Sequence, residues 1–244
     1  MSTSEPTIEP RSGLLNVVDI IVAPNAAFAR LSVVPTWGWA FLVATLAGIA
    51  GSLLAGPATL HAFEQWGPPL YAQSFQHLGS AERDQQVARA MSVGRIFVQF
   101  GWVGVPIALL VGSLVQAVVL LIGNAIGKGQ GSFAKFYALS MTAAVVGVGL
   151  TYLLAGVIAL IRGPGAYDTP TGVVSAVPGL AMLVPGATGK LQAFLSTLSV
   201  TALWSTALVA LGMVAIARVS RPVAWTTALV TLLGGALIAT AAVH

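Results

Sequence analysis

Five long stretches without a charged residue constrain the fold of this chain more than any other feature. They lie near residues 36–60, 97–123, 136–161, 193–217 and 223–243. Each reaches the length of about 20 apolar residues that a helix needs to cross a hydrocarbon core of roughly 30 Å. A backbone that crosses lipid must satisfy its own hydrogen bonds, and an α-helix does so within one segment. We therefore predict an all-α, polytopic membrane protein with five transmembrane helices.

Composition supports the same class. Of the 244 residues, 57% are hydrophobic and 7% are charged, whereas soluble domains carry about 25% charged residues. The chain has no cysteine, which excludes disulfides, thiolate metal sites and cysteine nucleophiles. Its net charge of +4, with most charges in loops, predicts contact with anionic lipids and no binding of nucleic acid. We expect residues 1–13 to be a flexible tail and residues 14–244 to form a single membrane domain.

Apolar residues ahead of the first stretch recur at helical spacing. These residues are Leu14, Leu15, Val18, Ile21 and Val22. Asn16 and Asp19 lie off this stripe, so the pattern predicts a short amphipathic helix on the membrane surface. Asp19 also interrupts the apolar run, which argues against a cleavable signal peptide. Pro24 ends this helix and begins a second short one, with proline in its first turn.

Two longer segments separate the stretches. Residues 61–95 are the more polar segment, and we expect Ser80 to cap a helix within it. Residues 162–192 are rich in Gly and Pro around an apolar core at 173–184. This core is too short to cross the bilayer. Two arrangements stay open for it: it lies in the interface, or it re-enters the membrane shallowly.

The distribution of Lys and Arg predicts the orientation. With a cytoplasmic N-terminus, cytoplasmic segments carry six basic residues and the remaining segments carry five. The short loops 124–135 and 218–222 hold four of the six, and short loops weigh most in the positive-inside rule. A composition rich in Ala, Gly and Val is typical of a bacterial protein. We expect a bacterial inner-membrane protein with a cytoplasmic N-terminus and a periplasmic C-terminus.

The segment IGNAIGKGQGSF, residues 122–133, raises the question of a phosphate-binding loop. A P-loop needs four residues between its first glycine and a Gly-Lys-Ser/Thr sequence. Only three separate Gly123 from Gly127, and Gly129 follows Lys128. The dinucleotide fingerprint also fails, because a serine stands where its third glycine is required. The segment therefore predicts a turn at the membrane surface between two spans.

No catalytic, cofactor or metal site is expected, and we do not predict an enzyme. The chain has three histidines and offers no serine–histidine–acid set. His61 and Glu64, together with His77, are chemically adequate ligands for zinc. Solvated or headgroup-facing side chains are the favoured interpretation of these residues.

None of the five stretches contains an ionisable residue, which argues against transport coupled to protons or sodium. Gln99, Gln116 and Asn124 are the candidates to line a passive pore. Hydrogen bonds between helices are the more ordinary role for such residues.

Small residues recur at four-residue spacing and predict close helix packing. They include Gly48, Gly104, Gly112 and Gly147. Packing within a monomer and a homo-dimer face both stay open. Pro57 and Pro106 are expected to bend their helices.

Several short motifs occur in a familiar order. They are P-x-x-x-F-x-x-L at Pro24, Phe28 and Leu31, the pair Trp37 and Trp39, G-K-G-x-G-S-F from Gly127 to Phe133, and W-x-x-x-L-x-x-x-G at Trp204, Leu208 and Gly212, followed by A-R-V-S at 217–220. Their order resembles the bacterial branch of the Yip family, five-span membrane proteins that interact with Ypt/Rab GTPases. The resemblance implies a polytopic protein without a known catalytic site. The acidic-Leu-Tyr-Gly-Pro motif of eukaryotic members is missing, so Rab binding does not carry over.

Two functional hypotheses follow. The first is a non-enzymatic scaffold that organises protein partners or lipids at the cytoplasmic face. Its expected contact residues are Pro24, Phe28, Lys128, Phe133, Lys135 and Arg218. Lys128 and Lys135 are expected at the headgroup level, with Phe133 and Phe136 inserted beside them, while Trp204 and Gly212 are expected to pack helices together. The second hypothesis is a passive channel or small-solute transporter.

Overall fold

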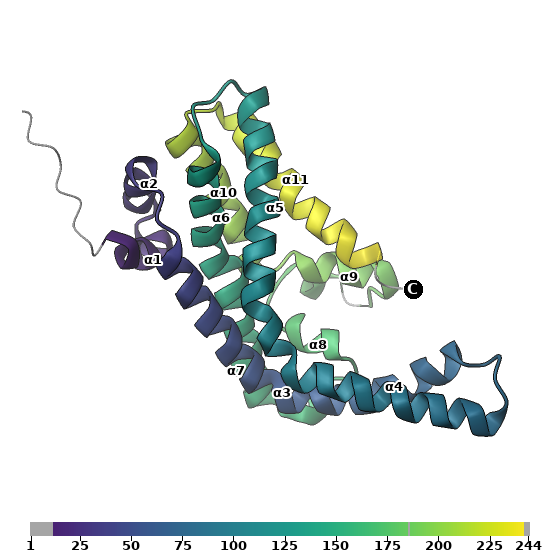
Figure 1. Cartoon of the computed structure of the whole chain (residues 1–244). Helices are drawn as coiled ribbons and strands as arrows, with labels where there is room; N and C mark the ends of the chain where they lie inside the picture. The colour runs from purple at the N-terminus through teal and green to yellow at the C-terminus, as the bar shows by residue number, and fades with distance from the viewer. Residues whose placement is uncertain (1–11, 185, 242–244) are drawn as a thin grey trace, which may run out of the picture. The chain divides into compact units, whose positions relative to one another are not determined.

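The structure, a computed structural model, describes residues 12–184 and 186–241, and this part of the chain is helical (Figure 1). Its helical segments that are long and apolar enough to cross a membrane are Gly38–Ser74, Ser80–Ile126, Phe133–Arg162, Val200–Ala217 and Arg221–Ala241. Two short helices, α1 (Ser12–Val22) and α2 (Pro24–Val33), precede them. The predicted fold class, with five spans and short N-terminal helices, is confirmed. Of the predicted tail, residues 1–11 lie outside the described residues.

The first two spans are longer than the charge-free stretches. Helix α3 (Gly38–Ser74) has 37 residues and contains three internal prolines. The second span consists of α4 (Ser80–Phe100), η1 (Gly101–Gly104) and α5 (Val105–Ile126). At a rise of 1.5 Å per residue, a helix as long as α3 measures about 55 Å, well beyond a hydrocarbon core of about 30 Å. Charged residues mark where such a helix leaves the lipid, and they do not mark where the helix ends.

A 3₁₀ turn accommodates Pro106 in the middle of this second span. Pro106 is the second residue of α5, and the Val105 N–H donates to the Trp102 carbonyl in the tighter 3₁₀ pattern. Proline has no N–H to offer that carbonyl, so the 3₁₀ turn supplies the missing hydrogen bond.

The start of α4 differs from the prediction. Ser80 is the first residue of α4, and Gly79 occupies the N-cap position without a side-chain hydrogen bond. The prediction that Ser80 caps this helix is therefore wrong.

The third span changes its helix type midway. It begins as α6 (Phe133–Ala144), continues as the π-helix η2 (Val145–Leu150) and ends as α7 (Thr151–Arg162). The wider π turn leaves backbone carbonyls without their usual α-helical partners. The Ser205 hydroxyl donates to one carbonyl beside it, that of Ala143, at 3.1 Å.

The fourth span begins later than predicted. Helix α10 (Val200–Ala217) does not extend back to residue 193, because α9 (Gly189–Thr197) is a separate helix. An isolated antiparallel bridge joins Gly179 to Ser199 at the break. The Val200 N–H donates to the Pro178 carbonyl at 2.9 Å and holds the start of α10 in place.

The connection between α7 and α9 consists of short helical pieces. They are η3 (Pro164–Ala166), α8 (Pro170–Val174) and η4 (Leu180–Leu183). Each is far too short to cross a bilayer. The last span is α11 (Arg221–Ala241), and the final residues of the predicted stretch 223–243 lie outside the described residues.

The described chain divides into two compact units, and each of the five spans contributes residues to both. Unit 1 comprises residues 12–44, 109–147 and 204–234, and unit 2 comprises residues 45–108, 148–203 and 235–241, apart from residue 185. Unit 1 holds the N-terminal helix pair and the two short turns that join α5 to α6 and α10 to α11. Unit 2 holds the connection between α3 and α4 and the connection between α7 and α10.

Small residues build the core of unit 2. A Cβ atom added to Gly156 on α7 would lie 2.9 Å from the Cα of Gly51 on α3, so the two backbones are almost in contact. Such close approach is typical of helix pairs in lipid. The buried cluster beside this crossing consists of Ala55, Ala58, Ala62, Ala159, Tyr167, Val173 and Ala176.

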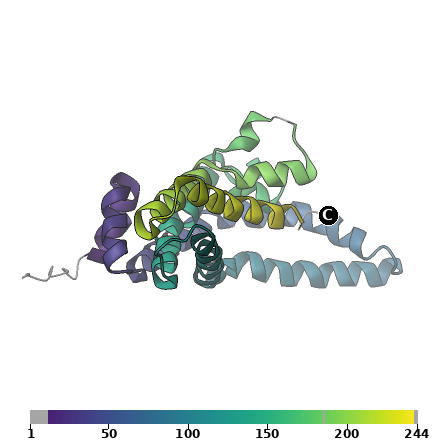
Figure 2. The ribbon, with the colours of Figure 1, turned by 90° about the horizontal axis from the view of Figure 1, so that it is seen from above.

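Larger side chains fill the core of unit 1. Its fully buried residues come mainly from α2, α6 and α10. They include Phe28, Leu31, Phe136, Leu139, Met141, Leu208 and Met213. Helices α1 and α2 lie side by side (Figure 2), and both contact α6.

Candidate functional site at the N-terminal helix pair and the basic turns

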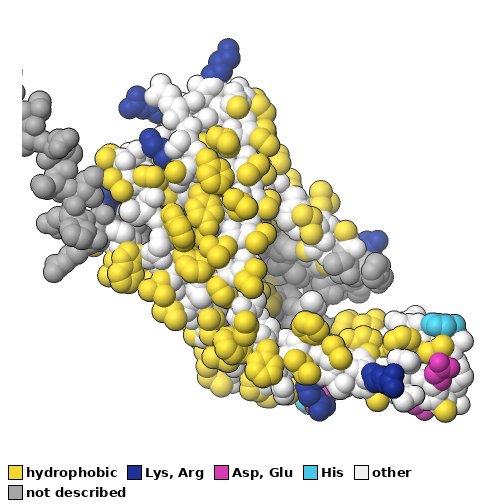
Figure 3. Space-filling model, viewed as in Figure 1, with side chains coloured by type: hydrophobic (Ala, Val, Ile, Leu, Met, Phe, Trp, Pro, Cys, Tyr) yellow, Lys and Arg dark blue, Asp and Glu magenta, His cyan; other side chains and the backbone are white. Residues whose placement is uncertain are grey.

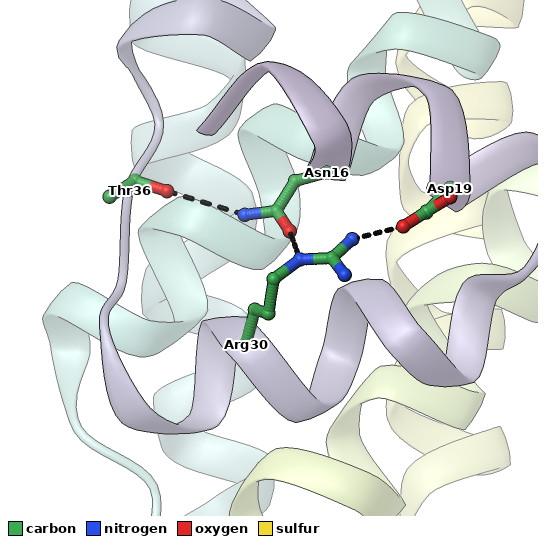
Figure 4. Close-up of polar contacts among 4 residues, drawn as sticks. All are labelled: Asn16, Asp19, Arg30 and Thr36. Carbon is green, nitrogen blue, oxygen red and sulfur yellow. Dashed lines mark hydrogen bonds and ion pairs between the residues drawn. The ribbon is translucent and has the colours of Figure 1, made fainter. Parts of the chain in front are cut away.

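A polar network joins α1 to α2 and to the linker before α3 (Figure 4). The Arg30 Nε donates to Asn16 Oδ1 at 2.7 Å, and the Arg30 guanidinium also pairs with the Asp19 carboxylate. The Asn16 amide donates in turn to the Thr36 hydroxyl at 3.3 Å. Asn16 is 2% exposed, so α1 turns its polar side toward the protein.

The opposite side of α1 is apolar and uncovered. Its residues Leu14, Leu15, Val18, Ile21 and Val22 form the stripe that helical spacing predicts. They are between 46% and 71% exposed. Because these side chains cover no core of the described chain, they are available to lipid or to a partner.

Helix α2 is attached to the rest of unit 1 through buried side chains. Phe28 and Leu31 are fully buried, and a Cβ atom added to Gly212 would lie 3.1 Å from Phe28 Cε1. Gly212 thus lets α10 approach α2 closely. The prediction that Phe28 contacts a partner or lipid is wrong, because the ring anchors α2 inside the protein. Pro24 is the first residue of α2 and is half-buried.

Backbone hydrogen bonds brace the turn after α5 against the turn after α10. The Gln130 N–H donates to the Ala217 carbonyl at 2.7 Å. Within the first turn, Asn124 Oδ1 accepts from the Gly131 N–H at 3.0 Å, and the Gly129 N–H donates to the Asn124 carbonyl at 2.8 Å. The glycine-rich segment is therefore an ordered turn fixed to a second turn.

A basic residue stands at the left-handed position of each turn. Lys128 has a φ of 50° and Arg218 a φ of 56°, and no other described residue except glycine has a positive φ. Both side chains are exposed. Among the described residues, neither Lys128 nor Arg218 forms an ion pair, nor do the neighbouring Lys135 and Arg221. Basic side chains gather at this end of unit 1, as Figure 3 shows.

An aromatic cluster lies beside the basic turns. The Tyr137 ring lies 5.4 Å from the Trp37 ring and 6.1 Å from the Phe133 ring, centroid to centroid. Trp39 contacts α1, because a Cβ atom added to Gly13 would lie 2.8 Å from Trp39 Cδ1. Trp and Tyr are enriched where hydrocarbon meets headgroups, so the cluster indicates the level of that interface in unit 1.

Two further contact predictions concern the residues around this cluster. Phe133 is partly exposed and Lys135 is half-buried. Phe136 was expected at the headgroups beside the lysines, and this prediction is wrong because the side chain is fully buried. Its ring is the neighbour of Gly131, where an added Cβ atom would lie 2.7 Å from Phe136 Cε2.

The residues predicted to pack helices fall into two groups. Gly48 faces Val105 and Gly147 faces Ser205, and a Cβ atom added to either glycine would lie within 3 Å of that neighbour. A Cβ atom added to Gly104 or Gly112 would meet no described atom within 4 Å. Trp204 is 42% exposed. Within the described chain, Gly104 and Gly112 therefore pack against no other helix, and Trp204 is only partly covered. Packing of these residues against a second copy stays a prediction.

The residues considered as possible metal ligands form hydrogen bonds with other side chains. His61 Nε2 lies 2.9 Å from Gln65 Nε2, and the Glu64 carboxylate accepts from Arg95 at 2.8 Å. The described residues contain no group of three or more His, Cys, Asp and Glu side chains that could hold a metal ion.

The pore candidates lie in different surroundings. Gln99 lines a cavity of about 340 Å³ in unit 2, together with Trp102 and Leu60. Gln116 is half-buried in unit 1. The Asn124 amide hydrogen-bonds the Gly131 backbone at its buried position, so it braces a turn and is not free to line a path.

Sequence reasoning missed two features of these sites. The first is the Arg30 network, whose signal was present as two polar residues, Asn16 and Asp19, on one side of an otherwise apolar helix. The second is the pair Gly51 and Gly156, which lies off the four-residue ridges and has no periodic signal of its own.

Comparison with known proteins gives one informative relative. The chain is 24% identical over 232 residues to the membrane protein YknW of Bacillus subtilis (strain 168), and the match covers 93% of this chain and 90% of YknW. No family model and no solved structure matches the chain. The protein is an integral membrane protein with a distant bacterial homologue, and the match extends through nearly the whole chain.

Proposed function

We propose that this protein is a non-enzymatic scaffold of the bacterial inner membrane, and a bacterial member of the Yip family. It organises partners or lipids at the cytoplasmic face, where we place the N-terminal helix pair and the basic turns. The observation that carries the proposal is the exposed apolar stripe of α1, which the Arg30 network holds in a fixed orientation. The order of the sequence motifs supports membership of the family, and the match along 93% of the chain to a bacterial membrane protein supports a bacterial membrane as its location.

The charge of unit 1 supports its place at an anionic membrane surface. Its described residues include five basic side chains and one acidic side chain, Asp19, which is already paired with Arg30. The described residues of unit 2 carry five basic and four acidic side chains. The positive excess therefore lies in the unit that also holds α1 and the aromatic cluster.

Typical free energies show how much the apolar stripe and the basic side chains each contribute to contact with the membrane surface. Burying a large apolar side chain is worth about 1.5–3 kcal/mol, and the half-exposed residues of the stripe gain roughly half of that each. One Lys or Arg near an anionic surface contributes about 1 kcal/mol. The five residues of the stripe thus contribute about 4–7 kcal/mol and the four cations unpaired among the described residues of unit 1 about 4 kcal/mol, so the two contributions are comparable and only the second depends on anionic lipid.

Cross-linking from α1 tests this proposal. Because the chain has no cysteine, Val18→Cys and Val17→Cys each introduce a single thiol. Val18 is exposed and Val17, the next residue, is buried, so they form a matched pair. In native membranes, a thiol-anchored photo-cross-linker at residue 18 is expected to give lipid or protein adducts that the residue 17 variant lacks. Equal adducts from both positions, or a purified protein that carries neither lipid nor partner, would contradict the proposal.

A further inference from the structure

We propose that Lys128 and Arg218 together bind the phosphate of an anionic phospholipid headgroup. The site deepens the proposed function and rests on it, because it requires that this end of unit 1 contacts lipid. It differs from a general attraction to the membrane surface, since it assigns one phosphate to two named side chains on two braced turns.

The backbone gives the first reason. A positive φ is unfavourable for every residue except glycine, because the Cβ atom crowds the carbonyl oxygen. The penalty is smaller for Asn and Asp than for other residues. The turn after α5 contains Gly127, Gly129 and Gly131, yet its left-handed position is Lys128. The turn after α10 repeats this choice with Arg218. Strained positions of this kind concentrate at functional sites, and here both carry an exposed cation.

The bracing gives the second reason. Lys128 is next to Gly129, and Arg218 is next to Ala217. A Cβ atom added to Gly129 would lie 2.9 Å from the Ala217 carbonyl oxygen, and the Gln130 N–H bonds that same oxygen at 2.7 Å. The two cations therefore start from neighbouring points on a fixed backbone. Binding a ligand between them requires little ordering of the turns, and this lowers the entropic cost of binding.

The unpaired positive charges around the two turns indicate that the ligand is an anion. Neither cation has an acidic partner among the described residues, and Lys135 and Arg221 add two more unpaired positive charges nearby. A guanidinium forms bidentate hydrogen bonds with phosphate, and a lysine ammonium adds a compact charge. The aromatic cluster of Trp37, Tyr137 and Phe133 indicates the headgroup level in the same unit. A lipid phosphate at that level is the anion that this geometry favours.

Glycine substitutions test the site without disturbing the turns. Lys128→Gly with Arg218→Gly removes both charges, and glycine adopts the left-handed conformation freely. The matched control is Arg162→Ala with Lys190→Ala, which removes two exposed cations from unit 2. Binding of phosphatidylglycerol to the purified full-length protein is measured by native mass spectrometry, with phosphatidylcholine and inorganic phosphate as the comparison ligands.

The wild-type protein is expected to retain one phosphatidylglycerol in preference to phosphatidylcholine. The double glycine variant should bind it about tenfold or more weakly, while the unit 2 control stays within about twofold. Lys128→Arg should retain binding, and the thermal unfolding midpoint of the glycine variant should not fall. Unchanged binding in the glycine variant, or an equal loss in the control, would overturn the proposal.

Inorganic phosphate distinguishes the two possible sources of the anion. If millimolar phosphate occupies the site and phosphatidylglycerol does not displace it, the ligand is a free phosphate and the lipid assignment is wrong. A different result would separate the two proposals. If neither double variant loses lipid binding, but the cross-linker at residue 18 still gives lipid or protein adducts, only this inference fails and the scaffold proposal stands.

Discussion

Arg30 and Arg95 each pair with one carboxylate, but they do so in different surroundings. The Arg30 and Asp19 side chains are 30% and 23% exposed, whereas those of Arg95 and Glu64 are 52% and 44% exposed. Arg30 also satisfies the carbonyl oxygen of the buried Asn16 amide. Exposed ion pairs contribute little to stability, while a buried polar group that loses its partner costs the full desolvation of that group.

Replacing these arginines should therefore have unequal effects. Arg30→Ala is expected to lower the free energy of unfolding by about 1–3 kcal/mol, because Asn16 and Asp19 both lose their partner. Arg95→Ala should lower it by at most about 1 kcal/mol. Chemical unfolding of both variants in the same detergent, followed by tryptophan fluorescence, measures the difference. Equal losses would show that the Arg30 network contributes no more than a surface pair.

At the scale of the elements, close contact between helices depends on particular glycines. Small residues at four-residue spacing do not all make such contacts. Gly156 faces the backbone of Gly51, and Gly112 faces open space, although both stand within predicted spans. A backbone cannot move away from an added methyl group as the end of a flexible side chain can. The same substitution should therefore destabilise the protein at Gly156 and should not destabilise it at Gly112.

Gly156→Ala is expected to destabilise the protein by at least about 2 kcal/mol, because the new methyl group overpacks the α3–α7 crossing. Gly112→Ala should be neutral or should stabilise it by up to about 1 kcal/mol, since alanine is the better helix former. Thermal unfolding of the two variants in detergent provides the comparison. A stable Gly156→Ala variant would show that α3 and α7 can separate without cost.

The existence of the five spans was predictable because an uncharged stretch of sufficient length has few other structures open to it. Their ends were less predictable. Helix α3 continues past residue 60 through polar sequence, since its hydrogen bonds are internal and do not depend on lipid. The start of α10 depends on the contact between Gly179 and Ser199, which joins residues distant in sequence and leaves no local signal.

Prediction of the candidate site had a similar limit. Lys128 and Arg218 were identifiable as surface cations, because a charged residue between two spans has to leave the hydrocarbon. Phe28 and Phe136 were not identifiable as core residues, because an aromatic side chain at this level can enter lipid or protein equally well. The left-handed conformation at Lys128 was hidden by the three glycines around it, each of which adopts such a conformation more easily.

At the scale of the whole molecule, an odd number of spans places the two ends of the membrane domain on opposite sides. The basic turns lie in unit 1, and the connection between α3 and α4 lies in unit 2. With the orientation proposed above, residue 220 faces the cytoplasm and residue 80 faces the periplasm. Both are exposed serines in a chain without cysteine.

Single-cysteine labelling tests this orientation. In intact cells with a permeabilised outer membrane, a membrane-impermeant maleimide should label Ser80→Cys and should label Ser220→Cys only after lysis. Adding Lys128→Glu and Lys135→Glu is expected to make labelling at residue 220 partial, because these charges weigh in the positive-inside rule. Labelling of residue 220 alone in intact cells would reverse the orientation.

The length of α3 affects how the protein responds to bilayers of different thickness. Its N-terminal end is tied to the interface by Trp37, which belongs to the aromatic cluster, and by Trp39, which contacts α1. Toward Ser74 the helix continues, at about 55 Å in total, past Glu64 and the exposed Trp66. Charged and aromatic residues of this kind mark the opposite interface, so the last turns of α3 extend beyond the hydrocarbon. A bilayer of different thickness is then accommodated by tilt of α3 between its two tryptophan levels.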